Sequence, residues 1–332
     1  MSLRLLTGIK PTGTLHLGNY VGAMRPTLSL MDNPSFKAFL FIADAHALTS
    51  VTDGTLLREQ TRAIAAAWLA MGLDPARVTF YRQTHVPQVF ELFWTLSCLC
   101  PKGLMNRAHA YKAVIQPLKD KGLSDVDQNV SMGLYNYPVL MAADILFLGG
   151  QRVPVGADQL QHVEIARDLA IKFNQIYGDI LVVPEAYVQK DMPSLRGLDG
   201  QKMSKSYGNV IPLFSETDAL RRLIFKIKTD SKRPEEPKDP EECTLFALHQ
   251  ALAEREQTDA VRARYQTGIG WAEMKELTFQ VVEAVISPLR QSYNQLMSDP
   301  KHIDAALYKG EARARDEAEI IMKRVRTCVG FT

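Results

Sequence analysis

The sequence has 332 residues, of which 46% are hydrophobic and 23% are charged, and these values are ordinary for a globular protein of two domains. A formal net charge of +2 excludes a general polyanion-binding surface, so that any nucleic-acid contact must come from local patches. No apolar stretch approaches the length of a membrane span, and the four cysteines show no metal-ligand spacing, so we expect buried free thiols and a cytoplasmic location.

The first part of the sequence alternates predicted strands with predicted helices. Apolar periodicity predicts strands at 3–9, 36–43 and 77–82 and helices at 16–31 and 55–71. This alternation is typical of a parallel sheet with crossover helices, an α/β Rossmann-like fold. Such sheets bind ligands at the carboxyl ends of their strands, where the segments 7–14 and 44–49 fall.

Helical segments dominate the remainder. Residues 86–150 lack a clear strand and are interpreted as a helical insertion in the sheet, which a strand at 180–183 then resumes. A loop containing Gly and Pro follows at 189–206. Helix-period apolar residues then predict four helices, at 215–228, 243–256, 271–297 and 313–329. The predicted fold class is α/β with an additional all-helical C-terminal domain.

Two short motifs, far apart in the sequence, offer groups that can bind a polyphosphate. The loop Lys202-Met203-Ser204-Lys205-Ser206 carries two lysines and two hydroxyls and has glycines on both sides. The turn Thr14-Leu15-His16-Leu17-Gly18-Asn19 follows a predicted strand and leads into a helix, whose N-terminus favours anions. Together the motifs indicate a nucleotide held between two half-sites.

In order and separation, the two motifs resemble the HIGH and KMSKS motifs of class I aminoacyl-tRNA synthetases. Further segments at 7–13, 44–49, 137–146 and 153–162 are similar to the bacterial tryptophanyl branch of that family, and the similarity extends from about Leu3 to Asn209. The resemblance implies activation of L-tryptophan by ATP to tryptophanyl-adenylate, release of pyrophosphate, and transfer to tRNA(Trp). It also implies a catalytic domain of residues 1–193 and a C-terminal domain of residues 194–332, which carries the KMSKS loop and recognises the anticodon.

Adenylate formation requires positioning and charge neutralisation, because the attacking carboxylate is already an anion. The resemblance implies the catalytic residues His16, Lys112, Lys202 and Lys205. It implies an ATP site made of Lys10, Pro11, Thr12, Gly18, Asn19, Gly156, Ala157, Asp158, Leu195, Lys202, Met203, Ser204, Lys205 and Ser206. Lys10 stands where several relatives carry a neutral amide, and it either places a cation near the α-phosphate or points to solvent. Lys112 has the alternative of an ordinary surface lysine.

Asp144 is the most informative residue of the predicted amino-acid pocket. Pro138 suits the first turn of a helix, and the helical spacing then places Asp144 on one face with the apolar Met141 and Ile145. A carboxylate on an apolar stripe is costly unless a group donates to it. That donor is either an internal partner or the indole N–H of tryptophan. The tryptophan-binding residues implied by the resemblance are Asp144, Met141, His46, Val153, Val155 and Gln159.

The segment after Gly156 is predicted to be a strand-to-helix turn. Asp158 can accept ribose hydroxyls there, and it is also predicted to cap the following helix, with Gln161 completing a capping box. His162 is interpreted as a structural histidine, because its spacing to Glu164 is not a helical ligand spacing. No metal site is predicted in the protein itself, and we expect Mg²⁺ to arrive bound to ATP.

Three alternatives stay open at the level of sequence. Tyrosine is the nearest alternative substrate, because its hydroxyl can also donate to Asp144. A small-molecule nucleotidyltransferase uses a similar His-x-Gly turn, and a synthetase-like regulatory protein is a third possibility, which the intact His16, Lys202 and Lys205 disfavour. The resemblance further implies a homodimer with its contact in the helical insertion. The sequence does not identify the anticodon-contacting residues.

Overall fold

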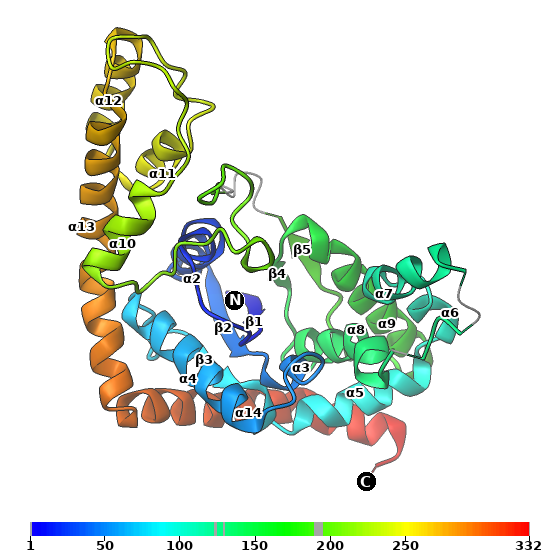
Figure 1. Cartoon of the computed structure of the whole chain (residues 1–332). Helices are drawn as coiled ribbons and strands as arrows, with labels where there is room; N and C mark the ends of the chain where they lie inside the picture. The colour runs from blue at the N-terminus through cyan, green and yellow to red at the C-terminus, as the bar shows by residue number, and fades with distance from the viewer. Residues whose placement is uncertain (1, 123–124, 129, 189–194, 332) are drawn as a thin grey trace.

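The computed structural model describes residues 2–122, 125–128, 130–188 and 195–331, so that part of the predicted loop at 189–206 lies outside the described residues. Five strands form one parallel sheet in the order β3-β2-β1-β4-β5 (Figure 1). The strands are β1 (Leu3–Ile9), β2 (Phe36–Ile42), β3 (Thr79–Arg82), β4 (Arg152–Pro154) and β5 (Glu185–Tyr187). The predicted strands at 3–9, 36–43 and 77–82 are confirmed as β1, β2 and β3.

The centre of the sheet is β1, which pairs with β2 along its whole length and with β4 at a single position, Leu5 opposite Arg152. The chain order of the strands reverses between β1 and β4. At such a reversal the crossover connections leave toward opposite faces, which opens a crevice at the carboxyl ends of the strands. Lys10 and Val155 directly follow the two strands that flank this crevice.

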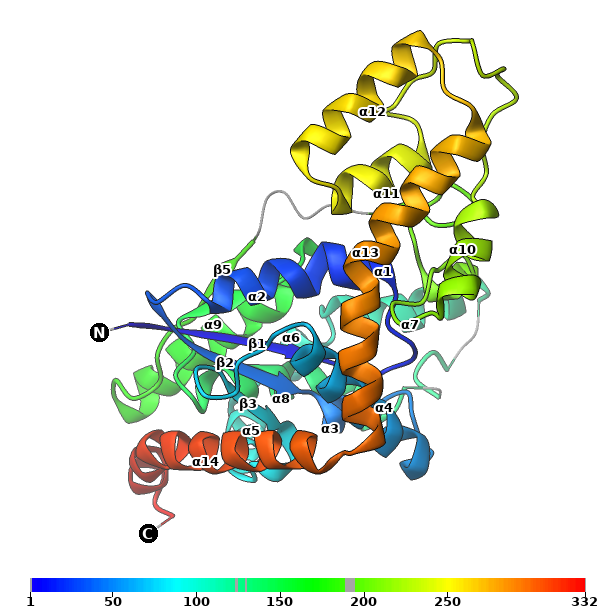
Figure 2. The ribbon, with the colours of Figure 1, turned by 90° about the vertical axis from the view of Figure 1, so that its left-hand side faces the viewer.

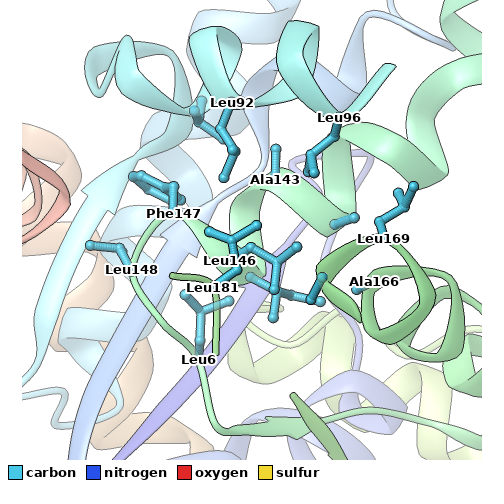
Figure 3. Close-up of a cluster of buried hydrophobic side chains, with 14 of the residues drawn as sticks. Leu6, Leu92, Leu96, Ala143, Leu146, Phe147, Leu148, Ala166, Leu169 and Leu181 are labelled. Atoms are coloured by element: carbon cyan, nitrogen blue, oxygen red, sulfur yellow. The ribbon is translucent and has the colours of Figure 1, made fainter. Parts of the chain in front are cut away.

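Helices cover both faces of the sheet because its strands are apolar on both sides. Leu5 packs with α2 and α4 on one face, and its neighbour Leu6 packs with α5, α8, α9 and α14 on the other (Figure 3). The N-terminal and insertion helices are α1 (Leu17–Asn19), η1 (Tyr20–Met24), α2 (Arg25–Met31), α3 (Asp44–Ala47), α4 (Gly54–Ala70), η2 (Gln83–His85), α5 (Gln88–Leu99), α6 (Lys102–Met105), α7 (His109–Asp120), α8 (Met132–Leu146), η3 (Ala157–Gln159) and α9 (Leu160–Tyr177).

The remaining helices follow the last strand. They are η4 (Lys205–Tyr207), α10 (Thr217–Phe225), α11 (Thr244–Leu252), α12 (Arg255–Thr267), α13 (Trp271–Ser298) and α14 (Lys301–Val329). Those from α10 to α13 form an arm with its own hydrophobic core, and α14 packs back against the sheet. Figure 2 shows α13 descending from the arm and α14 running beneath the sheet. None of the helices among the described residues is long and apolar enough to cross a membrane.

The last helix lies directly against β3, the edge strand of the sheet. Gly310 makes this approach possible, because a Cβ atom at that position would stand 1.7 Å from the carbonyl oxygen of Phe80. Arg82 at the end of β3 donates to the buried Glu311 at 2.6 Å. The edge of the sheet is therefore covered by a helix and fixed by a buried ion pair.

One predicted strand is wrong. Residues 180–183 form no strand, and the fifth strand follows them at β5. The reason is Asn174, whose Oδ1 accepts from the main-chain N–H groups of Ile180 and Leu181 and whose Nδ2 donates to the Leu181 carbonyl. These bonds hold residues 180–183 as a loop. The apolar pattern of the segment reflects its packing, and it was wrongly interpreted as a strand.

Helix boundaries differ from the predictions in four places, of which the smallest is α10, two residues shorter at its start and three at its end than the predicted 215–228. Pro138 does not lie in a first turn: it lies inside α8, which begins at Met132 after the N-cap Ser131. The predicted helix at 243–256 ends at Leu252, and the unpredicted α12 begins after Glu254, whose carboxylate and N–H form a capping box with Gln257. The helix expected at 313–329 starts twelve residues earlier, after Pro300. The helix expected at 16–31 is present with an internal π-helical turn, and that at 55–71 is confirmed as α4.

Candidate active site

A cavity of about 610 Å³ opens at the carboxyl ends of β1, β2 and β4. Most of its wall is apolar, with a few polar groups among the lining residues, which is the usual design of a small-molecule site. Its lining includes Gly8, Lys10, Phe41, His46, Thr49, Tyr137, Met141, Ile145, Val153, Val155, Gly156 and Gln159. The predicted tryptophan-site residues His46, Met141, Val153, Val155 and Gln159 therefore come together on one cavity.

Asp144 lies behind this wall. It is only 1% exposed, while Met141 and Ile145 of the same helix reach the cavity. His46 Nε2 lies 2.9 Å from Asp144 Oδ2, and Gln83 Nε2 donates to both carboxylate oxygens, at 2.7 and 2.9 Å. Burial raises the pKa of Asp144, and the bonds from His46 and Gln83 oppose that rise. Internal donors thus stabilise the charged form of this carboxylate.

The sequence analysis missed Gln83, although its position carried a signal. Gln83 directly follows β3, at the edge where a parallel sheet collects ligand-binding groups, and it is a polar residue after a buried apolar strand. Asp44, which follows β2, is buried at the same edge and accepts from Thr84 N and Thr84 Oγ1 at 3.0 and 2.5 Å.

His162 is a buried structural histidine with two hydrogen-bond partners. Tyr137 OH lies 2.9 Å from Nε2, and Gln159 Oε1 lies 2.9 Å from Nδ1. The tyrosine and the glutamine both line the cavity, so His162 orients two of its polar groups from behind. Burial lowers the pKa of His162, which favours the neutral ring.

The predicted capping box at Asp158 is wrong. The N-cap of α9 is Gln159, and no side chain caps that helix end. Asp158 lies in the short turn η3 and accepts instead from Gln159 Nε2 at 2.8 Å. Gln161 turns away to the start of α7, where its Oε1 accepts from His109 N at 2.7 Å. The extra turn of 3₁₀ helix moves both side chains out of capping positions.

The His16 turn is closed by a reciprocal pair of hydrogen bonds. His16 Nδ1 accepts from Asn19 N, and Asn19 Oδ1 accepts from His16 N. Because Nδ1 is an acceptor, the ring proton of the neutral histidine is on Nε2, which leaves a donor for an anionic ligand. Burial, together with the nearby charge of Lys205, lowers the pKa of His16 to about 4. The ring is therefore neutral at physiological pH.

The Lys202–Ser206 loop lies against the His16 turn. Lys205 Nζ donates to the carbonyl oxygen of Thr12 at 2.6 Å, and Gly18 N donates to Met203 Sδ at 3.3 Å. Met203 N in turn donates to Leu195 O, while the hydroxyls of Ser204 and Ser206 bond each other. The two motifs are far apart in the sequence, but they are in direct contact in the structure.

Asn209 organises this loop and was not among the predicted site residues. Its Oδ1 accepts from Ser204 N at 2.8 Å, and its Nδ2 donates to Lys202 O and to Asp199 Oδ1. Asn209 is buried, whereas the Lys202 side chain is exposed. A single amide therefore defines the course of the loop, leaving the Lys202 side chain in solvent while Lys205 reaches the Thr12 carbonyl oxygen.

The other predicted lysines differ in placement. Lys10 points into the cavity and donates to Thr49 Oγ1 at 2.8 Å, and burial lowers its pKa. Lys112 is exposed on α7, two residues after Ala110, which lines the cavity. Of the remaining predicted ATP-site residues, Pro11 is buried in the turn, Asn19 is half-buried, and Ala157 and Asp158 are exposed beside Gly156. Among the described residues, no group of three or more His, Cys, Asp or Glu side chains is placed to hold a metal ion. The four cysteines are free, but Cys98 is exposed and the other three are half-buried, so the expectation of buried thiols is wrong.

Comparison with known proteins agrees with this arrangement. Residues 1–287 match the family model described as "tRNA synthetases class I (W and Y)". The chain belongs to this family of class I synthetases. The resemblance seen in the two motifs is therefore confirmed, and so is the fold class of a parallel Rossmann-like sheet with a helical C-terminal region.

The synthetase has close relatives along its whole length. It is 45% identical to a "Tryptophan--tRNA ligase" of Neisseria meningitidis, over 99% of this chain and 98% of the relative. It is 47% identical to a protein of the same name from Xanthomonas campestris, over 100% of this chain and 77% of the relative. A crystal structure of tryptophanyl-tRNA synthetase from Campylobacter jejuni, complexed with ADP and tryptophan, superposes with a TM-score of 0.89 at 40% identity, over 99% of this chain and 100% of that one.

Proposed function

We propose that the chain is a tryptophan-tRNA ligase, which activates L-tryptophan with ATP to tryptophanyl-adenylate, releases pyrophosphate, and transfers the amino acid to tRNA(Trp). The observation that carries this proposal is the contact of Lys205 with Thr12 beside an apolar cavity large enough for an indole side chain. Full-length relatives that bear this name support it.

The amino-acid site is proposed to be the inner part of the cavity. His46, Met141, Val153 and Val155 surround the ring, and Gln159 lies near the rim. Asp144 is proposed as the acceptor of the indole N–H, since Oδ1 receives one hydrogen bond and retains an acceptor position. A ring without a donor would leave that carboxylate less well satisfied, and polar sites of this kind discriminate strongly.

The ATP site is proposed to lie between the His16 turn and the Lys202–Ser206 loop. Residues 10–12, Gly18 and Asn19 form one wall, residues 156–158 approach the ribose, and Leu195 with the loop forms the other wall. The carboxylate of tryptophan attacks the α-phosphorus, and pyrophosphate leaves. His16 donates from Nε2 to a phosphate oxygen, while Lys202, Lys205 and Lys112 neutralise charge that develops on the triphosphate.

Lys10 is proposed to place a positive charge where the tryptophan carboxylate attacks the α-phosphate. Its ammonium group points into the cavity, and its hydrogen-bond partner there is the neutral hydroxyl of Thr49. The described lining of the cavity includes the ammonium group of Lys10 and the hydroxyls of Thr49 and Tyr137, and it includes no carboxylate. Mg²⁺ is therefore proposed to be held by the phosphate oxygens of ATP and to share in neutralising their charge, which is the usual arrangement for this ion.

The larger organisation is part of the same proposal. Residues 1–193 would form the catalytic domain, and residues 194–332 would carry the loop and the helices that recognise the anticodon of tRNA. The helical insertion at 86–150 would form a homodimer contact in the cytoplasm. Two large apolar side chains in the insertion support that contact, since Trp94 is 64% exposed and Met132 is 67% exposed.

The deciding experiment is ATP–pyrophosphate exchange with tryptophan, tyrosine or phenylalanine as the only amino acid. We expect exchange that depends on tryptophan, followed by charging of tRNA(Trp). Exchange that depends mainly on tyrosine would indicate a tyrosine-specific synthetase instead. Exchange driven by none of the three would contradict a synthetase activity altogether.

The homodimer is tested separately by sedimentation velocity at micromolar concentration. We expect a dimer, which Trp94→Arg weakens, while Tyr308→Arg serves as a matched control because Tyr308 is equally exposed but lies on α14. A monomeric wild-type protein would contradict the proposed contact.

A further inference from the structure

Three consecutive residues of the turn η2 each bind a carboxylate that is buried by a different helix. Gln83 binds Asp144 of α8, Thr84 binds Asp44 of α3, and His85 Nδ1 lies 3.1 Å from Glu311 Oε2 of α14. Glu311, like Asp144, is 1% exposed. A three-residue turn that is anchored at every position has little freedom to move, so the Gln83 side chain is held in one place.

The orientation of the Gln83 amide is fixed by its partner. The side chain is completely buried, and Nε2 approaches both oxygens of Asp144. A reversed amide would place Oε1 against the carboxylate, and two acceptors in a buried site repel each other. Oε1 has no hydrogen-bond partner among the described residues. This orientation keeps a donor on Asp144 and leaves Gln83 Oε1 without a hydrogen-bond partner among the described residues.

The groups that face Asp144 show why this donor matters. His46 supplies the other hydrogen bond, and the carboxylate of Asp44 lies close enough to disfavour a second negative charge. Tyr81, also completely buried, lies near Asp144 and has no hydrogen-bond partner for its hydroxyl among the residues that the structure describes. Burial and the charge of Asp44 both favour the protonated form of Asp144. Without Gln83, only His46 would stabilise the charged form, so Asp144 would take up a proton more readily.

We propose that Gln83 is a positioning residue of the amino-acid site: it holds the Asp144 carboxylate charged and in one orientation, and thereby sets the preference for an aromatic ring that donates an N–H. This inference rests on the proposed tryptophan activity. Gln83 itself does not line the cavity, so it acts through Asp144 and His46.

The test compares tryptophan with its benzothienyl analogue, β-(3-benzothienyl)-alanine, in which sulfur replaces the N–H in a ring of nearly the same shape. Dissociation constants of both are measured by titration calorimetry between pH 5.5 and 8.5. Gln83→Met keeps the approximate shape of the side chain and removes its donor. Thr84→Val is the matched control, because it removes the neighbouring bond to Asp44 in the same turn.

We expect the wild-type protein to prefer tryptophan over the analogue by at least about tenfold, the discrimination of a charge-assisted bond. In Gln83→Met the preference should fall to about threefold or less, with binding of the analogue unchanged. The pH below which tryptophan affinity falls should rise by about one unit in this variant. Thr84→Val should keep most of the preference. His46 is present in all of these proteins, so a difference between their pH profiles reports on Gln83.

A purely structural Gln83 would lower stability without changing the preference or the pH profile, and that result would overturn the proposal. If Gln83→Met does not fold, Gln83→Glu is the second variant, because it retains the shape and places two carboxyl groups together. The pH below which tryptophan affinity falls should then rise further. An unchanged pH would again overturn the proposal. A wild-type protein that binds both ligands equally would also overturn it, while pyrophosphate exchange with tryptophan would still support the ligase activity. Failure of that exchange would instead remove the proposed function.

Discussion

Lys205 Nζ donates a hydrogen bond of 2.6 Å to the main-chain carbonyl oxygen of Thr12, across 193 residues of sequence. The contact brings an ammonium group to the turn that carries His16, and Gly13 allows it, since that glycine has a φ of +64° and the Lys205 side chain lies over it. A ligand phosphate can take the place of the carbonyl oxygen as the acceptor. The Lys202–Ser206 loop is therefore closed on the His16 turn in this structure.

Substitution of Lys205 should separate chemistry from binding. In Lys205→Ala the rate of adenylate formation should fall by about 100-fold or more, because a loop cation of this kind acts mainly on the transition state. The dissociation constant for tryptophan should stay nearly constant. Single-turnover pyrophosphate release is the measurement. If both Lys205→Ala and Lys202→Ala retain more than about half of the wild-type rate, the loop is an ordinary solvated turn.

Substitution of Asp144 should act on the amino acid instead. Asp144→Asn keeps the shape but replaces a charged acceptor with an amide, and it sets an NH₂ group against His46 or Gln83. We expect at least about a tenfold loss of tryptophan affinity, equivalent to a charge-assisted bond of roughly 1.5–3 kcal/mol, with ATP binding little changed. Titration calorimetry with tryptophan alone measures it. Asp158→Asn is the control, because that carboxylate is exposed and lies on the proposed ribose side.

The buried His16 should make the protein less stable in mild acid. Its folded-state pKa of about 4 lies below the ordinary value of 6.5, so between these limits the unfolded chain binds a proton that the folded chain does not. Stability is therefore lost as the pH falls from 6.5 toward 4. His16→Asn, which can still cap the helix, should show a smaller loss.

The measurement is urea unfolding of both proteins at pH 7.5 and pH 5. The wild-type protein should lose about 1–2 kcal/mol more than His16→Asn over this interval. Equal losses in the two proteins would show that His16 takes up a proton as readily in the folded state as in the unfolded chain.

The packing of α14 on β3 gives a steric prediction. Gly310→Ala should destabilise the protein by at least about 2 kcal/mol, because its Cβ would overlap the Phe80 carbonyl and the helix must shift. Gly103→Ala, the same change in the exposed helix α6 with only an arginine tip nearby, should be neutral or stabilising by less than about 1 kcal/mol. Thermal unfolding of the two variants tests this. Equal melting temperatures would contradict the close helix-to-strand contact.

Much of the catalytic architecture is readable from local pattern. The strands β1 to β3 are short and mostly apolar, and the His16 motif follows the first of them, so periodicity and residue type place His16 and Lys205 near a common crevice. Asn174 shows where this reasoning fails, since a side chain that binds the main chain turned an apolar run into a loop. The turn predicted at Gly156 implied a strand before it, but the bounds of β4 were not predicted, because three residues carry too little pattern.

The sequence did not pair Asp144 with its hydrogen-bond donors. A buried carboxylate needs donors, and the sequence places His46 and Gln83 after strands, but it does not show that either side chain reaches Asp144. Gln83 and His46 meet Asp144 because β2 and β3 end at one edge of the sheet and α8 carries Asp144 to the same place. The sequence could therefore identify the carboxylate as unusual, whereas the structure was needed to identify what keeps it charged.

The covered edge of the sheet also has a consequence for biosynthesis. Arg82 of β3 and Glu311 of α14 are 229 residues apart, so a ribosome adding about 5–20 residues per second exposes β3 well before its covering helix emerges. During roughly 10–45 seconds the nascent chain presents an unprotected strand edge, which is the kind of surface that chaperones retain and that aggregates capture. The enzyme's yield in the cell thus depends on what happens to β3 in that interval.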